Sequence, residues 1–591
     1  MKVLGKVSSW VQSLYDRLIS SETATGMVLS TAVGIMAGLG AYAFRWLIDN
    51  FHDLFFNDLG GTLGALDRYY IILIPAIGGL FVGLIIHFFA REAKGHGVPE
   101  VMAAVAAKGG RIRPRVVLAK ILASAICIGS GGSVGREGPI VQIGAAMGST
   151  VGQRFRLPEE WLRTLVACGA AGGISATFNA PIAGVFFALE VILGRFISRS
   201  FGFVVVSSVV ADVVAHALLG NEQTFLVPAY ELVSAWEIPL YVLLGILAAF
   251  AALVFIYVLY RSEDLFDAWK FPEYLKPVVG GVVIGLIGLY SLDLLGVGYG
   301  AVEKALTGNT ETTWGLVWVT LLLLGGLKIL ATSITIGSGG SGGVFAPSLF
   351  LGAVFGGAFG ILVNWLFPGI TAPPGAYALV GMAAVFSGAA RAPITSIIIL
   401  FEMTRQYEII LPLMLAVVIS TIVSRGLRAE SIYTTKVRRS GVDLRRHGEE
   451  DLMRTIRVSE AMTRDFPTVT TGTPVSELVT KLSRTGHHGF PVVDDEGRLA
   501  GVVTLADVEA APTDAITDLK VEDIATTSPI VAYPDQSLYE ALIRVGAKDV
   551  GRIPVVDRED PAKLLGVLRR HDIIKAYRKK LSGGIRYERG Y

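Results

Sequence analysis

Apolar stretches follow one another from about Met27 to Arg425 and predict a set of membrane helices. Four of the clearest are Met27–Ala43, Tyr70–Phe89, Leu240–Tyr260 and Trp314–Ile329. Several others are short or are interrupted by glycine and proline. A membrane tolerates such irregular backbone only where protein buries it or where it lines a cavity. Interrupted helices at matching positions in two halves therefore indicate the binding site of a transporter.

Beyond Asp443 the pattern changes to frequent charges, short strands and amphipathic helices. Two segments recur here at a distance of 63 residues: Val458–Met462 echoes Val521–Ile524, and Phe490–Asp494 echoes Ile553–Asp557. Two such units predict one soluble α/β lobe. We therefore place a membrane domain at 1–440, a linker at 441–457, the two units at 458–512 and 521–580, and a tail at 581–591.

The composition supports an integral membrane protein. Of the 591 residues 52% are hydrophobic and only 17% are charged, and the mean hydropathy is +0.57. A net charge of +2 gives no sign of a nucleic-acid partner. Both cysteines, Cys127 and Cys168, lie in apolar segments, which argues against a disulfide framework. The amphipathic start, Met1–Thr23, lacks the features of a cleaved signal peptide.

The membrane part contains an internal repeat. The segment from Lys120 to Ser133 recurs from Lys328 to Ser341, at an offset of 208 residues without a gap. Farther along, Glu190 corresponds to Glu402 at an offset of 212. The repeat divides this part into about 23–232 and 234–437. Whether the two copies are parallel or inverted depends on the number of spans in each, which the residues alone leave open.

A glycine-rich loop, Gly129–Pro139, carries the candidate chemistry of the first copy. A helix that begins near Pro139 directs its first unpaired amides and the positive end of its dipole at this loop, which favours an anion. Glu137 lies where that anion would lie, so its carboxylate can compete with the ion, act as a gate or carry a proton. The alternative is that the glycines only let helices pack closely. The second copy favours the functional interpretation, and there Phe345 stands opposite Glu137.

The soluble lobe resembles a tandem pair of CBS domains, which commonly bind adenine nucleotides between their two halves. The first unit has the family's Gly-x-x-Ser/Thr-x-x-Asp pattern at Gly501, Thr504 and Asp507. The resemblance implies that the hydroxyl binds phosphate and the carboxylate binds ribose. The second unit keeps Asp572 but has Arg569 at the hydroxyl position, where it could contact phosphate as a cation. Such a pair would bind ATP, ADP or AMP as a regulatory ligand, or it would only brace a dimer.

The membrane part resembles the CLC family of chloride channels and chloride/proton antiporters. Gly135–Pro139 matches the motif that holds the family's gating glutamate, here Glu137, and Gly342–Pro347 matches the motif whose amides bind the central anion. Tyr433 matches the tyrosine whose hydroxyl reaches that anion, and Gly95–Pro99 matches a third helix-start motif. The anion-binding residues implied by the resemblance are His96, Gly97, Arg136, Glu137, Gly138, Val344, Phe345, Ala346 and Tyr433.

The resemblance implies the architecture and location of the protein. We expect an all-α membrane domain of two inverted repeats, followed by the soluble α/β CBS pair. We also expect a homodimer in the cell membrane, with one glutamate-gated pore in each subunit and the CBS pair in the cytosol. The basic segment Lys436–Arg439 and Arg445-Arg446, after the last span, favours a cytosolic position there.

One departure from the family concerns the anion. After the first glycine of the third motif, chloride-handling members usually have serine, and some that prefer nitrate have proline, whereas this chain has His96. A neutral imidazole can donate one N–H to chloride, while a protonated one would bind more tightly and make transport sensitive to pH. The ring could equally turn away from the anion. Chloride is the expected substrate, with nitrate or fluoride as alternatives.

A second departure concerns protons. Many antiporters of the family have an inward-facing glutamate for which this chain has Val191, directly after Glu190. Valine cannot relay a proton, which leans the interpretation towards a passive channel. Because some antiporters also lack a carboxylate there, chloride/proton exchange remains the alternative.

Other classes of protein are less consistent with the chain. An enzyme would need a nucleophile–base pair, a metal cluster or a phosphate loop, and none is recognisable, so we expect no catalysis, no metal and no required cofactor. The pair His487 and His488 lacks further metal ligands nearby. A cation pathway would need acidic residues or carbonyl rings, whereas these loops present amides. Glu190 and Glu402, at matching helix ends, are expected to bind backbone amides.

Overall fold

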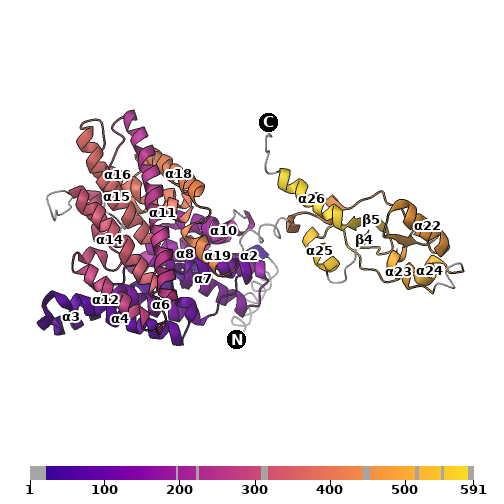
Figure 1. Ribbon diagram of the computed structural model, residues 1–591, viewed down its shortest axis with the longest axis horizontal. Coiled ribbons are helices and arrows are strands. Elements are labelled where there is room, and N and C mark those ends of the chain that lie inside the picture. The colour runs from indigo at the N-terminus through magenta and orange to yellow at the C-terminus, as the bar shows by residue number, and fades with distance from the viewer. Residues whose placement is uncertain are drawn as a thin grey trace, which may run out of the picture. The chain divides into compact units, whose positions relative to one another are not determined.

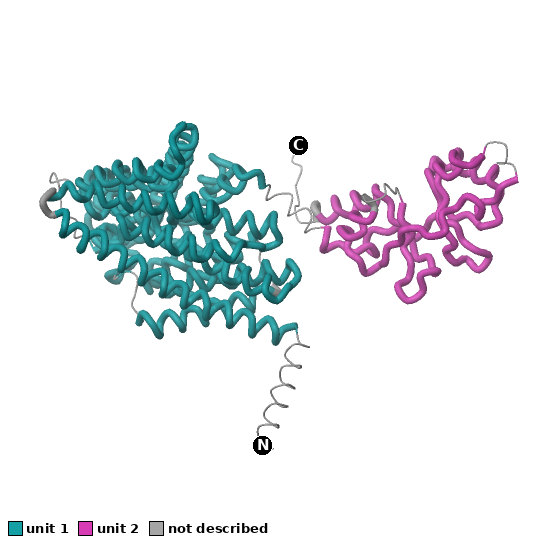
Figure 2. Tube along the Cα trace, turned by 90° about the horizontal axis from the view of Figure 1, so that it is seen from below, with its two compact units in different colours: residues 1–442 teal, residues 443–591 magenta. Residues whose placement is uncertain are grey.

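The chain divides into two compact units, residues 1–442 and 443–591 (Figures 1 and 2). The computed structural model describes residues 22–194, 198–220, 225, 227–307, 317–442, 453–512, 518–546 and 552–583. Most of the amphipathic start, Arg445-Arg446, and parts of the expected linker and tail lie outside the described residues. Each unit is considered by itself below.

Helices make up the described part of the first unit (Figure 1). The first half consists of α2 (Glu22–His52), η1 (Asp53–Leu59), α3 (Gly60–Thr62), η2 (Gly64–Tyr69), α4 (Tyr70–Phe88), η3 (Arg91–Ala93), α5 (Val98–Ala107), α6 (Arg115–Gly129), α7 (Glu137–Arg154), α8 (Glu159–Phe178), α9 (Pro181–Phe187), η4 (Ala188–Ile192) and α10 (Ser198–Leu219). The second half consists of η5 (Ala235–Glu237), α11 (Ile238–Ala268), α12 (Lys276–Gly288), η6 (Leu292–Leu294), α13 (Tyr299–Thr307), α14 (Val317–Gly337), α15 (Phe345–Leu366), α16 (Pro374–Ala390), α17 (Pro393–Thr404), α18 (Ile410–Leu427) and α19 (Ile432–Arg439).

Seven helical stretches of the described chain are long and apolar enough to cross a bilayer. The four expected spans fall in α2, α4, α11 and α14, although the first three residues of the last span, 314–316, lie outside the described residues. Shorter apolar helices, among them α5, α12 and α17, lie between the long ones. A long helix satisfies its own backbone hydrogen bonds in lipid. The irregular backbone at the ends of a short helix must instead be buried by protein or line a cavity. The predicted all-helical membrane domain is confirmed.

The two halves contact each other reciprocally, as parts related by a two-fold axis do. A Cβ atom at Gly79 would lie 2.3 Å from the carbonyl oxygen of Pro277, and one at Gly281 would lie 2.2 Å from that of Pro75. The two glycines are separated by 202 positions, and so are the two prolines. Helices α4 and α12 can approach this closely only because glycine has no side chain at these crossings. The repeat in the sequence is therefore a two-fold pseudosymmetry of the structure.

Two glutamates join the halves in the same reciprocal manner. The carboxylate of Glu190 accepts hydrogen bonds from the amides of Ile394 (3.3 Å) and Thr395 (2.8 Å) at the start of α17. The carboxylate of Glu402 accepts from the amides of Ile182 (3.0 Å) and Ala183 (2.7 Å) at the start of α9. Each carboxylate thus binds the positive end of the other half's helix. The prediction that these glutamates bind backbone amides is confirmed.

The second unit contains two similar α/β subdomains, each with its own hydrophobic core. In the first, β1 (Val469–Thr470) pairs parallel with β2 (Gly489–Val493), which pairs antiparallel with β3 (Leu499–Thr504). In the second, β4 (Arg552–Val556) pairs antiparallel with β5 (Leu564–Arg569). The surrounding helices are α21 (Val458–Ala461), α22 (Val475–Thr485), α23 (Leu505–Ala510), α24 (Val521–Ile524), α25 (Leu538–Gly546) and α26 (Arg570–Gly583). Phe490 in β2 and Ile553 in β4, 63 positions apart, are both fully buried.

Candidate functional site

Three glycine-rich loops meet in the first unit and are joined by main-chain hydrogen bonds. The amide of Gly95 donates to the carbonyl of Gly340 (3.1 Å), and the amide of Gly342 donates to the carbonyl of Gly95 (3.3 Å). Gly135 and Gly343 exchange two hydrogen bonds, of 2.8 and 2.6 Å. These loops lead into α5, α7 and α15, so three helix N-termini converge on one place.

Glycine is required where the first of these loops crosses the start of α7. A Cβ atom at Gly138 would lie 2.1 Å from the carbonyl oxygen of His96, which is too close for any side chain. Gly97 has a φ of 82° and faces the carbonyl of Gly138, which a Cβ atom there would approach to 2.7 Å. A side chain at either position would therefore separate the His96 loop from the loop that carries Glu137.

The carboxylate of Glu137 lies at the start of α15, where the helix end favours an anion. Oε2 accepts a hydrogen bond from the amide of Ala346 (3.3 Å), and Oε1 accepts one from the hydroxyl of Tyr299 (2.9 Å). The residue is 1% exposed. A buried carboxylate is costly unless donors surround it, and here the donors come from the second half of the unit.

His96, in the first of the converging loops, and Tyr433 are neighbours. Both are buried, and their ring centres are 6.3 Å apart. Neither ring nitrogen of His96 has a hydrogen-bond partner among the described residues. Tyr433 lies in the first turn of α19, which Ser431 caps and which the Tyr260 hydroxyl contacts at the carbonyl of Ile432. A buried polar ring without a partner needs an explanation, and a bound anion or water would supply one.

The remaining residues of the predicted anion site have different roles. The side chain of Phe345 is buried between Phe178 and Phe386, with ring centres at 5.1 and 4.3 Å, while Val344 directly precedes the helix. This packing holds the first amides of α15 at the loop. The guanidinium of Arg136 lies 5.5 Å from the ring centre of Tyr299, and its Nε has no hydrogen-bond partner among the described residues.

Tyr299 is a residue of the site that the motifs did not indicate. It follows Gly296-Val-Gly298, which matches Gly95-His-Gly97 at an offset of 201 residues. The structure supports this match, because Gly97 and Gly298 have nearly the same φ, 82° and 84°. A search for a second copy of the third motif could have found it, although a match of two glycines is short.

Two buried lysines hold the matching loops. The ammonium of Lys120 donates to the carbonyls of Ala93 (3.0 Å) and Gly95 (2.8 Å). That of Lys328 donates to the carbonyls of Leu294 (3.3 Å) and Gly296 (3.0 Å). Both side chains are fully buried. Each lysine therefore fixes the turn that precedes one residue of the site, His96 in the first half and Tyr299 in the second.

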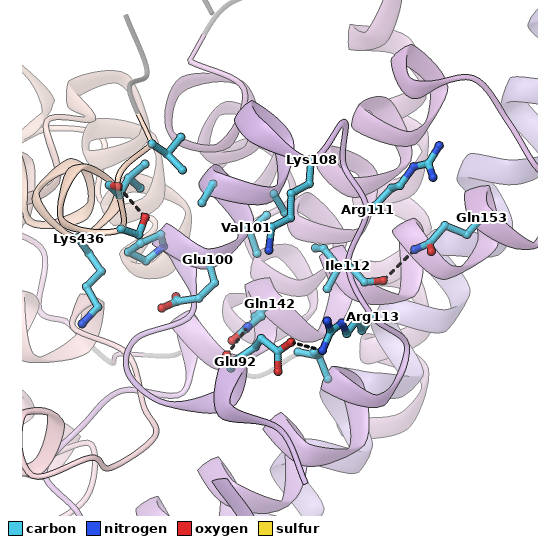
Figure 3. A pocket seen from close by; sticks show the side chains of 17 residues that line it. Glu92, Glu100, Val101, Lys108, Arg111, Ile112, Arg113, Gln142, Gln153 and Lys436 are labelled. Carbon is cyan, nitrogen blue, oxygen red and sulfur yellow. Dashed lines mark hydrogen bonds and ion pairs between the residues drawn. The ribbon is translucent and has the colours of Figure 1, made fainter. Parts of the chain in front are cut away.

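A pocket of about 540 Å³, which we call the α5 pocket, lies beside the His96 loop (Figure 3). Its charged and amide-bearing residues are Glu92, Glu100, Lys108, Arg111, Arg113, Gln142, Gln153 and Lys436. Glu92 pairs with Arg113 at 3.2 Å, and Lys436 pairs with Glu263 at 3.0 Å. In contrast, Oε2 of Glu100 and Oε1 of Gln142 are buried and lack partners among the described residues. Two acceptors beside a cavity of this size would suit water or a proton donor.

Val191 lies in η4, a π-helical segment that continues α9. Its side chain is 6% exposed, and α5 packs against the segment. The position at which many antiporters have a carboxylate is therefore an apolar contact in this chain. The carboxylate of Glu190, the preceding residue, already accepts hydrogen bonds from two amides of α17.

In the second unit the predicted nucleotide residues form two pairs. Asp507 accepts from both the amide and the hydroxyl of Thr504, at 2.7 Å each. Asp572 accepts from Nε (2.7 Å) and Nη2 (3.0 Å) of Arg569, whose Nη2 also donates to Thr463. Burial alone would raise the pKa of the Asp572 carboxyl, but the hydrogen bonds and charge of Arg569 bring this pKa below its ordinary value. The two half-sites therefore differ in charge and in how firmly their residues are held.

Metal-binding clusters and disulfides are absent from the residues that the structure describes. No group of three or more His, Cys, Asp or Glu side chains there could hold a metal ion. Cys127 and Cys168 are buried free thiols.

Helix N-termini that converge on a buried glutamate, in a unit of helices long and apolar enough to cross a bilayer, are the arrangement of a membrane protein that transports anions. Residues 78–425 match the family described as voltage gated chloride channel, and residues 458–512 and 521–579 match the CBS domain, so the chain belongs to the CLC family and carries a CBS pair.

Relatives match this chain over different shares of its length. The chloride channel protein CLC-f of Arabidopsis thaliana is 30% identical, over 94% of this chain and 81% of that protein. The H⁺/Cl⁻ exchange transporter ClcA of Vibrio cholerae is 34% identical, over 70% of this chain and 89% of that protein. The crystal structure of a slow cyanobacterial Cl⁻/H⁺ antiporter has a TM-score of 0.65 and 27% sequence identity, and covers 70% of this chain and 97% of its own.

Proposed function

We propose that the protein transports chloride along a pathway that Glu137 closes by occupying the anion position at the start of α15. The observation that carries the proposal is the carboxylate of Glu137 on the amide of Ala346, at 3.3 Å. When the carboxylate takes up a proton or moves aside, this amide becomes available to the permeating ion. Amides and hydroxyls bind an anion without the tight hold of a full positive charge, so the ion can leave again.

The identity of the anion depends on His96. Its two unpartnered ring nitrogens support a direct role, in which a neutral ring donates one N–H to the ion. Chloride suits such a donor. Nitrate and fluoride are the alternatives, and each can replace chloride in the assay described below.

Passive conduction is favoured by Val191. An apolar, buried side chain at this position cannot take up a proton. In this mode chloride moves down its gradient, and protons act only on the gate.

Coupled chloride/proton exchange is the second candidate. ClcA and the cyanobacterial antiporter are exchangers by their names, and each covers 70% of this chain. Glu100 supports this mode within the chain, because its unpartnered Oε2 lies at the α5 pocket, four positions after His96 in the sequence. A carboxyl group there could load protons from the side to which the pocket opens.

Flux from chloride-loaded liposomes, with external chloride and pH followed together, tests the proposal. We expect wild-type efflux to rise as the pH falls, and Glu137→Gln to run at the acid rate at every pH. An unchanged rate and pH response in Glu137→Gln would refute the gate. Uphill proton movement in a fixed ratio to chloride identifies an exchanger, and chloride efflux without protons identifies a channel. If no chloride moves, nitrate and fluoride become the candidates.

If protons are coupled, Glu100→Gln separates the role of this carboxyl from that of the gate. We expect the variant to keep chloride movement and lose proton movement. Glu92→Gln is the matched control, because its carboxylate lines the same pocket but already pairs with Arg113. Coupling that survives in Glu100→Gln would remove Glu100 from the proton route.

The CBS pair supports a regulatory role in a homodimer with these units in the cytosol. Thr504, Asp507, Arg569 and Asp572 would bind an adenine nucleotide, with Arg569 offering a cation to its phosphates. Addition of ATP or AMP to the CBS side of the liposomes should change chloride flux. Asp507→Ala should abolish this response, and an equal response in the variant would exclude the site.

A further inference from the structure

Tyr299 is the second donor to the gating carboxylate. Its hydroxyl donates to Oε1 of Glu137 at 2.9 Å, while the amide of Ala346 donates to Oε2. Both donors belong to the second half of the membrane unit, and the carboxylate belongs to the first. Glu137 is thus held by one hydroxyl and one main-chain amide, which are the groups that also bind small anions.

The position of Tyr299 is set by contacts on several sides. Lys328 fixes the turn before it through the carbonyls of Leu294 and Gly296. The guanidinium of Arg136 faces the ring, and the ring of Phe225 meets it edge-on with centres 5.0 Å apart. Because these contacts do not involve the Glu137 carboxylate, we expect the hydroxyl to stay in place when the carboxylate leaves.

The pseudosymmetry relates the loop before Tyr299 to the loop that carries His96. Gly95–Gly97 and Gly296–Gly298 are matching loops, each held by a buried lysine. The first loop places His96 beside Tyr433, and the second places Tyr299 against Glu137. Each of the two matching loops therefore positions one polar side chain of the candidate site, His96 in the first half and Tyr299 in the second.

We propose that the Tyr299 hydroxyl is an anion ligand at the position that the Glu137 carboxylate occupies at the start of α15, which we call the outer position. The hydroxyl is shared in turn by the Glu137 carboxylate and the permeating anion. The inference rests on the proposed role of Glu137 as the gate. With Glu137 in place the hydroxyl stabilises the closed state. When Glu137 leaves, the same hydroxyl and the Ala346 amide bind chloride or a similar small anion. Tyr299 then sets both the pH at which the gate opens and the affinity of the outer position.

Other groups act on the same carboxylate. Among the described residues, Arg136, Lys328, Tyr299 and Tyr433 are the charged and titratable side chains that act electrostatically on Glu137. In a Tyr299→Phe variant the other three side chains remain, and only the Tyr299 hydroxyl is lost. A change in the pH response of this variant therefore reports the hydrogen bond.

The pH profile of chloride flux tests the closed-state role. Loss of a donor to the carboxylate should let the gate open at less acid pH, so we expect half-maximal flux of Tyr299→Phe about one pH unit higher than wild type. Tyr230→Phe is the matched control, because it removes a buried tyrosine hydroxyl that donates to Leu306 in the same helix, α13, and leaves Glu137 untouched. A wild-type profile in Tyr299→Phe would overturn this role.

Chloride binding by titration calorimetry tests the ligand role without the gate. In a Glu137→Ala background we expect Tyr299→Phe to weaken chloride binding about tenfold, as the loss of one charge-assisted hydrogen bond would. Equal affinity with and without the hydroxyl would overturn it. This measurement needs only purified protein and does not depend on flux.

The two proposals fail in different ways. If Glu137→Gln keeps the wild-type pH response, the gate itself is wrong. If Glu137→Gln loses the response while Tyr299→Phe keeps the wild-type profile and affinity, the gate stands and the inference about Tyr299 is wrong.

Discussion

The two halves of the membrane unit have matching backbones but different side chains at the converging loops and helix starts. Glu137 stands opposite Phe345 at the starts of α7 and α15, yet the two loops exchange backbone hydrogen bonds as equals. His96 likewise stands opposite Val297. The comparison teaches that the repeated backbone gathers amides at one place. Single side chains then place the Glu137 carboxylate in one half and its donors in the other.

Removal of the two buried lysines tests whether the halves depend equally on their loops. Lys120→Met and Lys328→Met each leave two buried carbonyls without this donor, so we expect each to lower the free energy of unfolding by about 2–4 kcal/mol. Thermal unfolding in detergent measures this loss. Lys276→Met, which removes a lysine bonded to the single carbonyl of Phe266, should cost less.

The same variants should differ in function. Lys328→Met should shift the pH profile of flux as Tyr299→Phe does, because Lys328 holds the Tyr299 turn. Lys120→Met should leave the gating pH in place. Identical pH profiles in the two variants would contradict the inference that the Lys328 loop acts on Glu137 and the Lys120 loop only on His96.

The reciprocal glutamates allow a direct comparison of the two halves. Glu190→Gln should lower stability by about 1–3 kcal/mol, because one of its oxygens becomes an amide that faces backbone donors. Glu402→Gln should cost somewhat less, since Glu190 also accepts from the Thr395 hydroxyl. The variants are compared by thermal unfolding, with the exposed Glu408→Gln as the control. A larger loss from Glu402→Gln would contradict this ranking.

His96 and Val297 test whether matching loop positions have distinct duties. We expect His96→Ser to change the ratio of chloride to nitrate or fluoride flux by about 2- to 10-fold, the effect of altering one hydrogen-bond donor. Val297→Ser should leave the ratio unchanged. If both variants change selectivity equally, His96 has no direct contact with the ion.

The CBS half-sites offer the smallest expected effect. Because the pKa of Asp572 is lowered in the folded unit, its contribution is fully present above the ordinary value of about 3.9 and is lost as the pH falls through the lower folded value. At pH 7, Asp572→Asn should destabilise α26 by about 1–2 kcal/mol. Hydrogen exchange of α26 at neutral and acid pH measures this. The difference from wild type should shrink in acid, whereas Asp507→Asn should leave α26 unaffected.

Much of the protein could be predicted because its patterns are local or repeated. Apolar runs predict membrane helices, since a segment in lipid must satisfy its own backbone groups. The 208-residue repeat predicted two related halves, and the loop Gly129–Pro139 predicted that Glu137 lies at an anion position beside a helix N-terminus. The two units after Asp443 predicted the CBS pair. Each of these features is carried by contiguous residues whose physical demands do not depend on distant partners.

Tertiary structure decided what joins these parts. Tyr299 could not be assigned from two glycines, because only the fold shows that its hydroxyl reaches a carboxylate 162 positions away. The exchange of Glu190 and Glu402 between helix ends, and the unpartnered nitrogens of His96, also depend on contacts between distant segments. Hydrogen bonds and burial are set by distances in space. The sequence by itself therefore determined the elements and the loop that carries Glu137, whereas packing decided which groups bind the Glu137 carboxylate.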